Sequence, residues 1–168
     1  MLISLIGVIL AVGIPAFVRS LRTSKMAEAP LELIRIHAAL ASYYTTPQST
    51  PSGKRMRCIP EAAGPTPAQP SRDPIAVDFG AADTPGSATW RAIGYEPSTP
   101  IRYRYSILTT ASGCGTTPVN ERIESVLTLR AEGDLDGDGV LSRYQRSVNA
   151  EDGQLVLNPM LDVRDRIE

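Results

Sequence analysis

The hydrophobic and polar positions of the chain divide it into an apolar beginning and a mixed body. Residues 1–18 contain no charged side chain, and Ser4 is their only clearly polar residue. A helix of this length extends about 27 Å, slightly less than the hydrocarbon core of a bilayer. Every charge of the chain follows from Arg19 onward. The pattern therefore predicts that segment 1–18 is buried in lipid or against protein, and that the remainder faces water.

Three interpretations of segment 1–18 are open. A cleaved signal peptide has a basic region before its apolar run and a small-residue cleavage site after it, and neither is found here. A plain membrane anchor is the second interpretation, and it would normally lead into a linker. The third is the first half of a longer helix, which we favour because the residues after Phe17 remain compatible with a helix.

The residues that follow have the periodicity of an amphipathic helix. Apolar side chains recur every three or four positions and share one face; they are Met26, Ala29, Leu33, Ile36, Leu40 and Tyr43. We therefore predict one long helix over 1–44, apolar in its first half and amphipathic in its second. Bends are expected at Pro15 and Pro30, because proline removes a backbone donor and crowds the preceding turn. The alternative is two helices separated at Pro30.

The body, 45–168, begins with a proline-rich loop region and continues with strand patterns. Seven prolines lie between positions 45 and 74, without apolar periodicity, so we expect an irregular loop region over 45–89. Alternating apolar residues predict an antiparallel sheet over 90–168. Its four expected strands are 101–110, 123–131, 140–148 and 154–158. With the helix stripe covering the apolar face of this sheet, the fold class is α+β.

Composition narrows the function classes. The 17 basic and 18 acidic residues leave a net charge of −1, which lacks the concentrated positive charge on which nucleic-acid binding depends. One histidine and two cysteines argue against zinc sites and Cys/His catalysis. His37 lies next to the apolar stripe of the predicted helix, where we expect a packed or surface side chain and not a ligand. No phosphate-binding loop or dinucleotide fingerprint occurs. We expect neither an enzyme nor a nucleic-acid-binding protein.

The N-terminal part resembles the type IV pilins. The resemblance rests on Gly7, on the stretch Ile14-Pro15-Ala16-Phe17, on the basic residues of 19–25 and on the amphipathic continuation. Two later stretches, 90–105 and 133–139, resemble pilin-like proteins of the myxobacterial type. No residue here matches the glutamate that pilins carry near the mature N-terminus, so the resemblance assigns no residue to peptidase processing or N-methylation.

The resemblance implies a pilin-like shape and a structural role in a type IV pilus-like helical filament. Such a subunit is anchored in the inner membrane before assembly and then binds copies of itself in an extracellular pilus on the cell surface. For a fibre of this kind, roles in motility, cell adhesion and DNA uptake all stay open. Two alternatives stay open: a pseudopilin of a secretion system, and a single-pass membrane-anchored extracellular domain that binds calcium.

The apolar segment would form the core of the filament. Between its glycine and its proline we expect the helix to unwind when subunits pack, and the alternative is a continuous kinked helix. The residues assigned to the filament core are Leu2, Ile3, Leu5, Ile6, Gly7, Val8, Ile9, Leu10, Val12, Ile14, Pro15 and Phe17.

Cys58 and Cys114 are the only cysteines of the chain. In an exported protein the oxidising surroundings favour a disulfide between them. The bond would tie the proline-rich loop region to the turn after the first predicted strand. The alternative is two unpaired, buried thiols.

An acidic, glycine-rich segment carries the clearest chemical motif. Asp134, Asp136 and Asp138 have the spacing of the first half of an EF-hand loop, in which the Val140 carbonyl and Ser142 would be further ligands. The twelfth position of this motif holds glutamine where an EF-hand has its bidentate glutamate, so we expect weak affinity. We predict a calcium site that rigidifies a hairpin, and the alternative is an acidic turn without metal.

Overall fold

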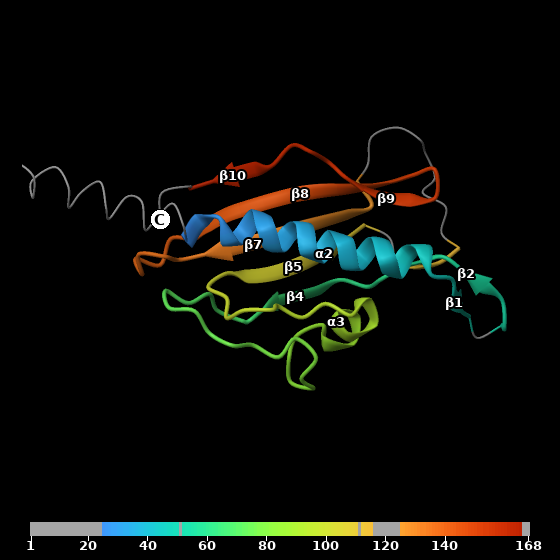
Figure 1. Cartoon of the computed structure of the whole chain (residues 1–168), viewed down its shortest axis with the longest axis horizontal. Coiled ribbons are helices and arrows are strands. Elements are labelled where there is room, and N and C mark those ends of the chain that lie inside the picture. The colour runs from blue at the N-terminus through green and yellow to red at the C-terminus, as the bar shows by residue number, and fades with distance from the viewer. Residues whose placement is uncertain (1–24, 51, 111, 116–124, 166–168) are drawn as a thin grey trace, which may run out of the picture.

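The fold is an α+β arrangement in which β structure predominates. The computed structural model describes residues 25–50, 52–110, 112–115 and 125–165. Its largest element is a six-stranded antiparallel sheet, in the order β10-β8-β7-β5-β4, with β9 also paired to β8 (Figure 1). These strands are β4 (Ala63–Thr66), β5 (Arg104–Thr109), β7 (Leu127–Gly133), β8 (Ser142–Glu151), β9 (Gln154–Leu157) and β10 (Asp162–Arg164).

Two helices and two small sheets complete the described part. Helix α2 (Glu28–Thr45) crosses the large sheet, and helix α3 (Ser87–Ile93) lies beside it (Figure 1). The small sheets pair β1 (Gln48–Ser49) with β2 (Arg55–Met56), and β3 (Cys58–Ile59) with β6 (Gly113–Cys114).

The predicted continuous helix over 1–44 is wrong in the part that the structure describes. A turn at Ala27 separates α2 from the helical residues 25 and 26. Pro30 is the third residue of α2, where a backbone amide has no intrahelical partner and proline is tolerated. A continuous helix would require the amide at position 30 to bond to the carbonyl at 26, and proline has no such amide. Residues 1–24 lie outside the described part.

The predicted four-stranded sheet is also wrong, because the sheet has six strands in the described ranges alone. Strands β5, β7, β8 and β9 overlap the predicted ones, whereas β4 and β10 were not expected. β4 lies in the proline-rich stretch, and its register shifts between Ala63 and Thr66, which accommodates Pro65 at the edge of the sheet. β10 has only three residues, too few for an alternating pattern.

Helix α3 lies across the boundary that the sequence suggested between the loop region 45–89 and the sheet region 90–168. Gly86 and Gly94 flank it in left-handed conformations, and a Cβ at Gly86 would collide with Ala63. Trp90 of α3 is fully buried and meets Phe79 edge to face, with ring centroids 5.0 Å apart. Its indole donates to the Thr66 hydroxyl at 3.1 Å. α3 thereby covers the β4 edge of the sheet.

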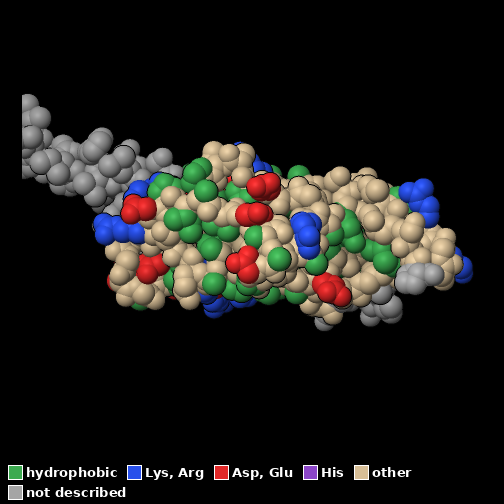
Figure 2. Space-filling view, turned by 90° about the horizontal axis from the view of Figure 1, so that it is seen from below, with side chains coloured by type: hydrophobic (Ala, Val, Ile, Leu, Met, Phe, Trp, Pro, Cys, Tyr) green, Lys and Arg blue, Asp and Glu red, His purple; other side chains and the backbone are tan. Residues whose placement is uncertain are grey.

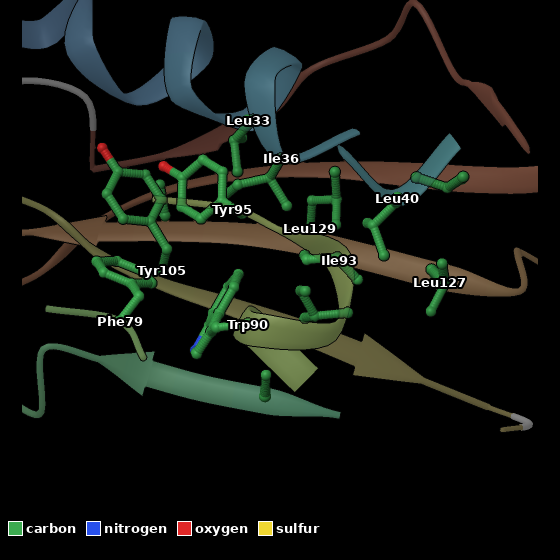
Figure 3. Close-up of a cluster of buried hydrophobic side chains, with 14 of the residues drawn as sticks. Leu33, Ile36, Leu40, Phe79, Trp90, Ile93, Tyr95, Tyr105, Leu127 and Leu129 are labelled. Carbon is green, nitrogen blue, oxygen red and sulfur yellow. The ribbon is translucent and has the colours of Figure 1, made fainter. Parts of the chain in front are cut away.

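The core lies between the helices and one face of the sheet (Figure 3). On α2 the predicted stripe is confirmed at four positions with no exposed area, Ala29, Leu33, Ile36 and Leu40, and Tyr44 is buried in place of the expected Tyr43. Burying a Leu or Ile side chain contributes about 1.5–3 kcal/mol. The sheet supplies the facing side chains at alternate positions, as predicted: Tyr105, Ile107, Leu127, Leu129, Ala131, Tyr144 and Val148.

The described part is elongated, and its two ends differ. One end carries the beginning of α2, the β7–β8 hairpin and the end of β10, and the opposite end carries the β1–β2 hairpin (Figure 1). None of the helices in the described ranges is long and apolar enough to span a bilayer. The predicted membrane segment, 1–18, is outside those ranges.

The predicted disulfide between Cys58 and Cys114 is confirmed. The two cysteines are direct partners in the register of β3 and β6, and they are 56 residues apart in the chain. The bond therefore closes a long loop that contains α3 and β4, and it restricts the unfolded chain more than the folded one.

Removing this disulfide should destabilise the protein. For a loop of this length, the entropy model gives a loss of about 4 kcal/mol in the free energy of unfolding. We expect the Cys58→Ser/Cys114→Ser variant to melt at lower temperature than the oxidised protein, and reductant to shift only the latter. If the oxidised parent melts at the same temperature with and without reductant, the prediction is contradicted.

Candidate functional site

The first turn of α2 is hydrogen-bonded to the segment that leads into β5 and to the start of that strand. The Oε1 atom of Glu28 accepts hydrogen bonds from the amides of Arg102 and Tyr103, at 2.7 and 3.3 Å, and from the Tyr105 hydroxyl at 3.2 Å. Its Oε2 atom accepts from the Arg102 guanidinium at 3.3 Å. Hydrogen bonds to an ionised carboxylate are stronger than neutral ones, so this single side chain holds the helix to the sheet at several points.

One turn further, Glu32 makes a second attachment. Its side chain is buried, although it carries a charge. Oε2 accepts from the Tyr95 hydroxyl at 2.9 Å, and Oε1 accepts from the Arg35 guanidinium at 2.6 Å. Arg35 also donates to the Ser98 hydroxyl at 2.9 Å. We call Glu28 and Glu32, together with these partners, the helix anchor.

The tyrosines of the helix anchor stay protonated. Burial, and then the charge of Glu32, raise the pKa of Tyr95 far above its ordinary value. Burial and the charge of Glu28 do the same to the pKa of Tyr105. Both hydroxyls therefore remain hydrogen-bond donors over the whole physiological range, which keeps the carboxylates of Glu28 and Glu32 partnered.

The sequence did not reveal the helix anchor. Glu28 and Glu32 occupy polar positions between the apolar ones of the helix, which is the usual place for solvated side chains. The available signal was their spacing of four residues, directly beside Ala29 and Leu33 of the stripe. By contrast, His37 is a packed side chain, as expected: its Nε2 lies 3.0 Å from the Leu155 carbonyl of β9.

The second candidate site is the acidic loop, 134–139, between β7 and β8. The carboxylate oxygens of Asp134, Asp136 and Asp138 lie within 4.8 Å of one another, which is the ligand type and density that hard cations take. Leu135 is buried in the core and holds the loop against the sheet. The sequence spacing alone predicted that these carboxylates converge.

The same carboxylates also bind backbone amides. Asp134 accepts from Gly137 at 2.7 Å and from Gly139 at 3.1 Å. Asp136 and Asp138 each accept from the amide two residues later, at 3.3 and 2.7 Å. These bonds shape the turn without a metal, so the calcium site and the metal-free turn both stay predictions.

The two further residues proposed as calcium ligands, Ser142 and Val140, make hydrogen bonds within the β7–β8 hairpin. The Ser142 hydroxyl is buried and donates to the Gly133 carbonyl at 3.1 Å, across the base of the hairpin. The Val140 amide donates to Asp138, and its side chain is about half exposed. The structure therefore brings the three carboxylates together and uses the serine to close the hairpin.

The residues predicted for the filament core, from Leu2 to Phe17, lie outside the described part, and so does the expected unwinding between Gly7 and Pro15.

On the face seen in Figure 2, acidic and basic side chains are interspersed, and no continuous basic area is visible. Comparisons with protein-family models, curated proteins and solved structures find no match.

Breaking the helix anchor should lower the free energy of unfolding more than a glutamate substitution at an exposed site does. Replacing Glu32 by alanine leaves the Tyr95 hydroxyl without its partner in the core, and an unsatisfied buried polar group typically costs about 1–3 kcal/mol. We expect urea unfolding of Glu32→Ala to show a loss of this order. The control Glu61→Ala, at an exposed site, should stay within about 0.5 kcal/mol of the parent. Equal losses in the two variants would refute the anchor.

Calcium should stabilise the protein through the acidic loop. At a free concentration ten times the dissociation constant, binding adds about 1.4 kcal/mol to the free energy of unfolding. We expect millimolar calcium to release or absorb heat in calorimetry and to raise the melting temperature. Both effects should disappear in Asp134→Asn/Asp136→Asn/Asp138→Asn and persist in the exposed control Asp73→Asn. If the parent shows no heat and no shift, the loop is a metal-free turn.

Proposed function

We propose that this protein is a structural subunit of a type IV pilus-like filament. In this proposal the apolar segment 1–18 lies in the inner membrane before assembly and then packs against the same segment of other copies in an extracellular fibre. The body, from α2 onward, forms the outer part of the fibre. No catalytic step is involved.

The observation that carries the proposal is the position of the helix anchor. Glu28 and Glu32 lie in the first two turns of α2, the end that follows the apolar segment in the chain. A subunit held in a fibre by its N-terminal segment must transmit axial force from that segment to its folded body. Charge-assisted hydrogen bonds at the entry of α2 attach the helix to β5 and its flanking segment where such a force would arrive.

Two further features support assembly with like copies. Segment 1–18 has no polar face, as expected for a helix that is surrounded by lipid or by other helices. Leu31 and Ile34, on the side of α2 away from the sheet, are about half exposed. Contacts that repeat between different surfaces without closing into a ring generate a helical fibre.

The acidic loop favours a second candidate, a single-pass anchored extracellular domain that binds calcium. Its three converging carboxylates are the specific observation in its favour. In that case the same apolar segment would remain in the membrane, and the chain would not enter a fibre. A pseudopilin would use the same segment but would form a short assembly instead of a surface fibre.

Electron microscopy of material sheared from cells that express the tagged full chain should show long fibres labelled for this protein. An arginine at the centre of an apolar helix costs about 2.5–3.5 kcal/mol in insertion experiments, so Ile9→Arg should abolish the fibres. Ser52→Arg, on the exposed β1–β2 hairpin, should leave them unchanged. Labelled membranes without fibres would favour the anchored domain, and short assemblies confined to the envelope would favour the pseudopilin.

A further inference from the structure

The face of the sheet opposite α2 carries a row of arginines. Side chains alternate along strands, and the core contains only the positions that face the helices. The other positions place Arg104 of β5, Glu132 of β7, Arg143 of β8 and Arg164 of β10 directly opposite one another in register. We call this row, together with Arg130 and Asp162 beside it, the arginine face.

Positive charge is in excess on this face. Arg104 and Arg143 share one carboxylate, that of Glu132, at 2.8 and 2.9 Å. Burial alone would raise the pKa of Glu132, but the hydrogen bonds and charges of these two arginines outweigh it and hold the pKa below its ordinary value. Two positive charges therefore share a single negative charge, which leaves one positive charge in excess.

The neighbouring groups do not restore the balance. Arg130 contacts the Gln145 amide oxygen through its Nε atom at 3.2 Å, and it forms no ion pair within the described ranges. Asp162 lies 3.8 Å from Arg164, in an exposed pair. These six residues thus carry four guanidinium groups and two carboxylates. Arg130 and Arg143 are only half-buried, so an acidic partner can still reach them.

The described helices leave this face open. The buried side chains of α2, and Trp90 and Ile93 of α3, belong to the core cluster on the opposite side. The arginine side chains themselves lie over the sheet, and Arg104 is the least exposed of those paired with a carboxylate. A partner with carboxylates that project from a turn could reach the guanidinium groups without displacing any described helix.

The chain itself contains a complementary element. The acidic loop has three carboxylates, two of them on exposed residues, and none forms an ion pair within the part of the chain that the structure describes. The loop lies at one end of the molecule, beyond the paired part of the sheet (Figure 1). In the metal-free loop three negative charges project, and they match the two excess positive charges of the arginine face in sign and roughly in amount.

We propose that the arginine face binds the acidic loop of a second copy of this chain. This contact joins two different surfaces, so each copy keeps one loop and one face free for further neighbours, and the contact can repeat indefinitely. The inference deepens the proposed filament function and depends on it, because it names a contact between the bodies of neighbouring subunits. Segment 1–18 would supply the core contacts, and this pair would set the register of the bodies around it.

A charge exchange in the full chain tests the proposal. The first variant, Arg130→Glu/Arg164→Glu, reverses the net charge of the arginine face. It leaves the ion pairs of Arg104 and Arg143 with Glu132 in place. The second, Asp136→Arg/Asp138→Arg, reverses the loop. Each variant alone should lower the sedimented fibre mass at least tenfold. The chain with all four changes, and an equimolar mixture of the two variants, should recover to within about threefold of the parent. The matched control Lys54→Glu/Arg55→Glu, on the β1–β2 hairpin, should stay within twofold.

The outcomes separate this contact from the filament proposal itself. Melting temperatures close to the parent's show that the variants fold. A four-change chain as defective as the single variants, or a defect with the reversed face but none with the reversed loop, overturns the contact while fibres of the parent remain. If the parent forms no fibres, sedimentation velocity of the mixed variants in detergent at low salt decides the question. Association that requires both variants and is lost at high salt supports the contact, and no association overturns it.

Discussion

The contact between the first two turns of α2 and the segment leading into β5 governs the rest of the structure. An 18-residue helix is only marginally stable alone in water, so α2 depends on burying its apolar stripe against the sheet. Apolar burial has little directional preference and would tolerate sliding of the helix along its axis. The carboxylates of Glu28 and Glu32 remove that freedom, because their oxygens must meet particular amides and hydroxyls.

The periodic features of the fold could be predicted from the sequence, whereas its irregular features could not. Apolar residues at helical spacing identified the buried face of α2, and alternation identified the inward positions of β5 and β7. Pro30 was interpreted as a bend inside a long helix, although a proline is equally compatible with a first helical turn. β4 was missed because glycine and proline usually argue against a strand, and at an edge they do not. α3 is too short for its periodicity to show.

The candidate sites divide in the same way. The acidic loop is local in sequence, so its spacing alone predicted that the three carboxylates meet. The disulfide could be predicted because the chain has only two cysteines to pair. The helix anchor joins Glu28 and Glu32 to residues 63 to 77 positions away, and no local pattern signals such a partnership. Whether a glutamate is buried or solvated depends on these distant partners, and the residue type alone does not indicate it.

The separation of features along the long axis has a practical consequence for labelling. The end of β10, the acidic loop and the beginning of α2 share one end of the molecule (Figure 1), so a protein domain fused after the last strand would crowd the acidic loop, through which we propose that copies of the chain meet. The β1–β2 hairpin lies at the far end (Figure 1), and its turn residue Ser52 is exposed. Gly53 beside it has a φ of +77°, which favours glycine, so a label belongs at Ser52. Insertions in exposed tips of this kind are usually tolerated. A small epitope or a fluorophore at Ser52 can therefore report on the protein while leaving the opposite end free.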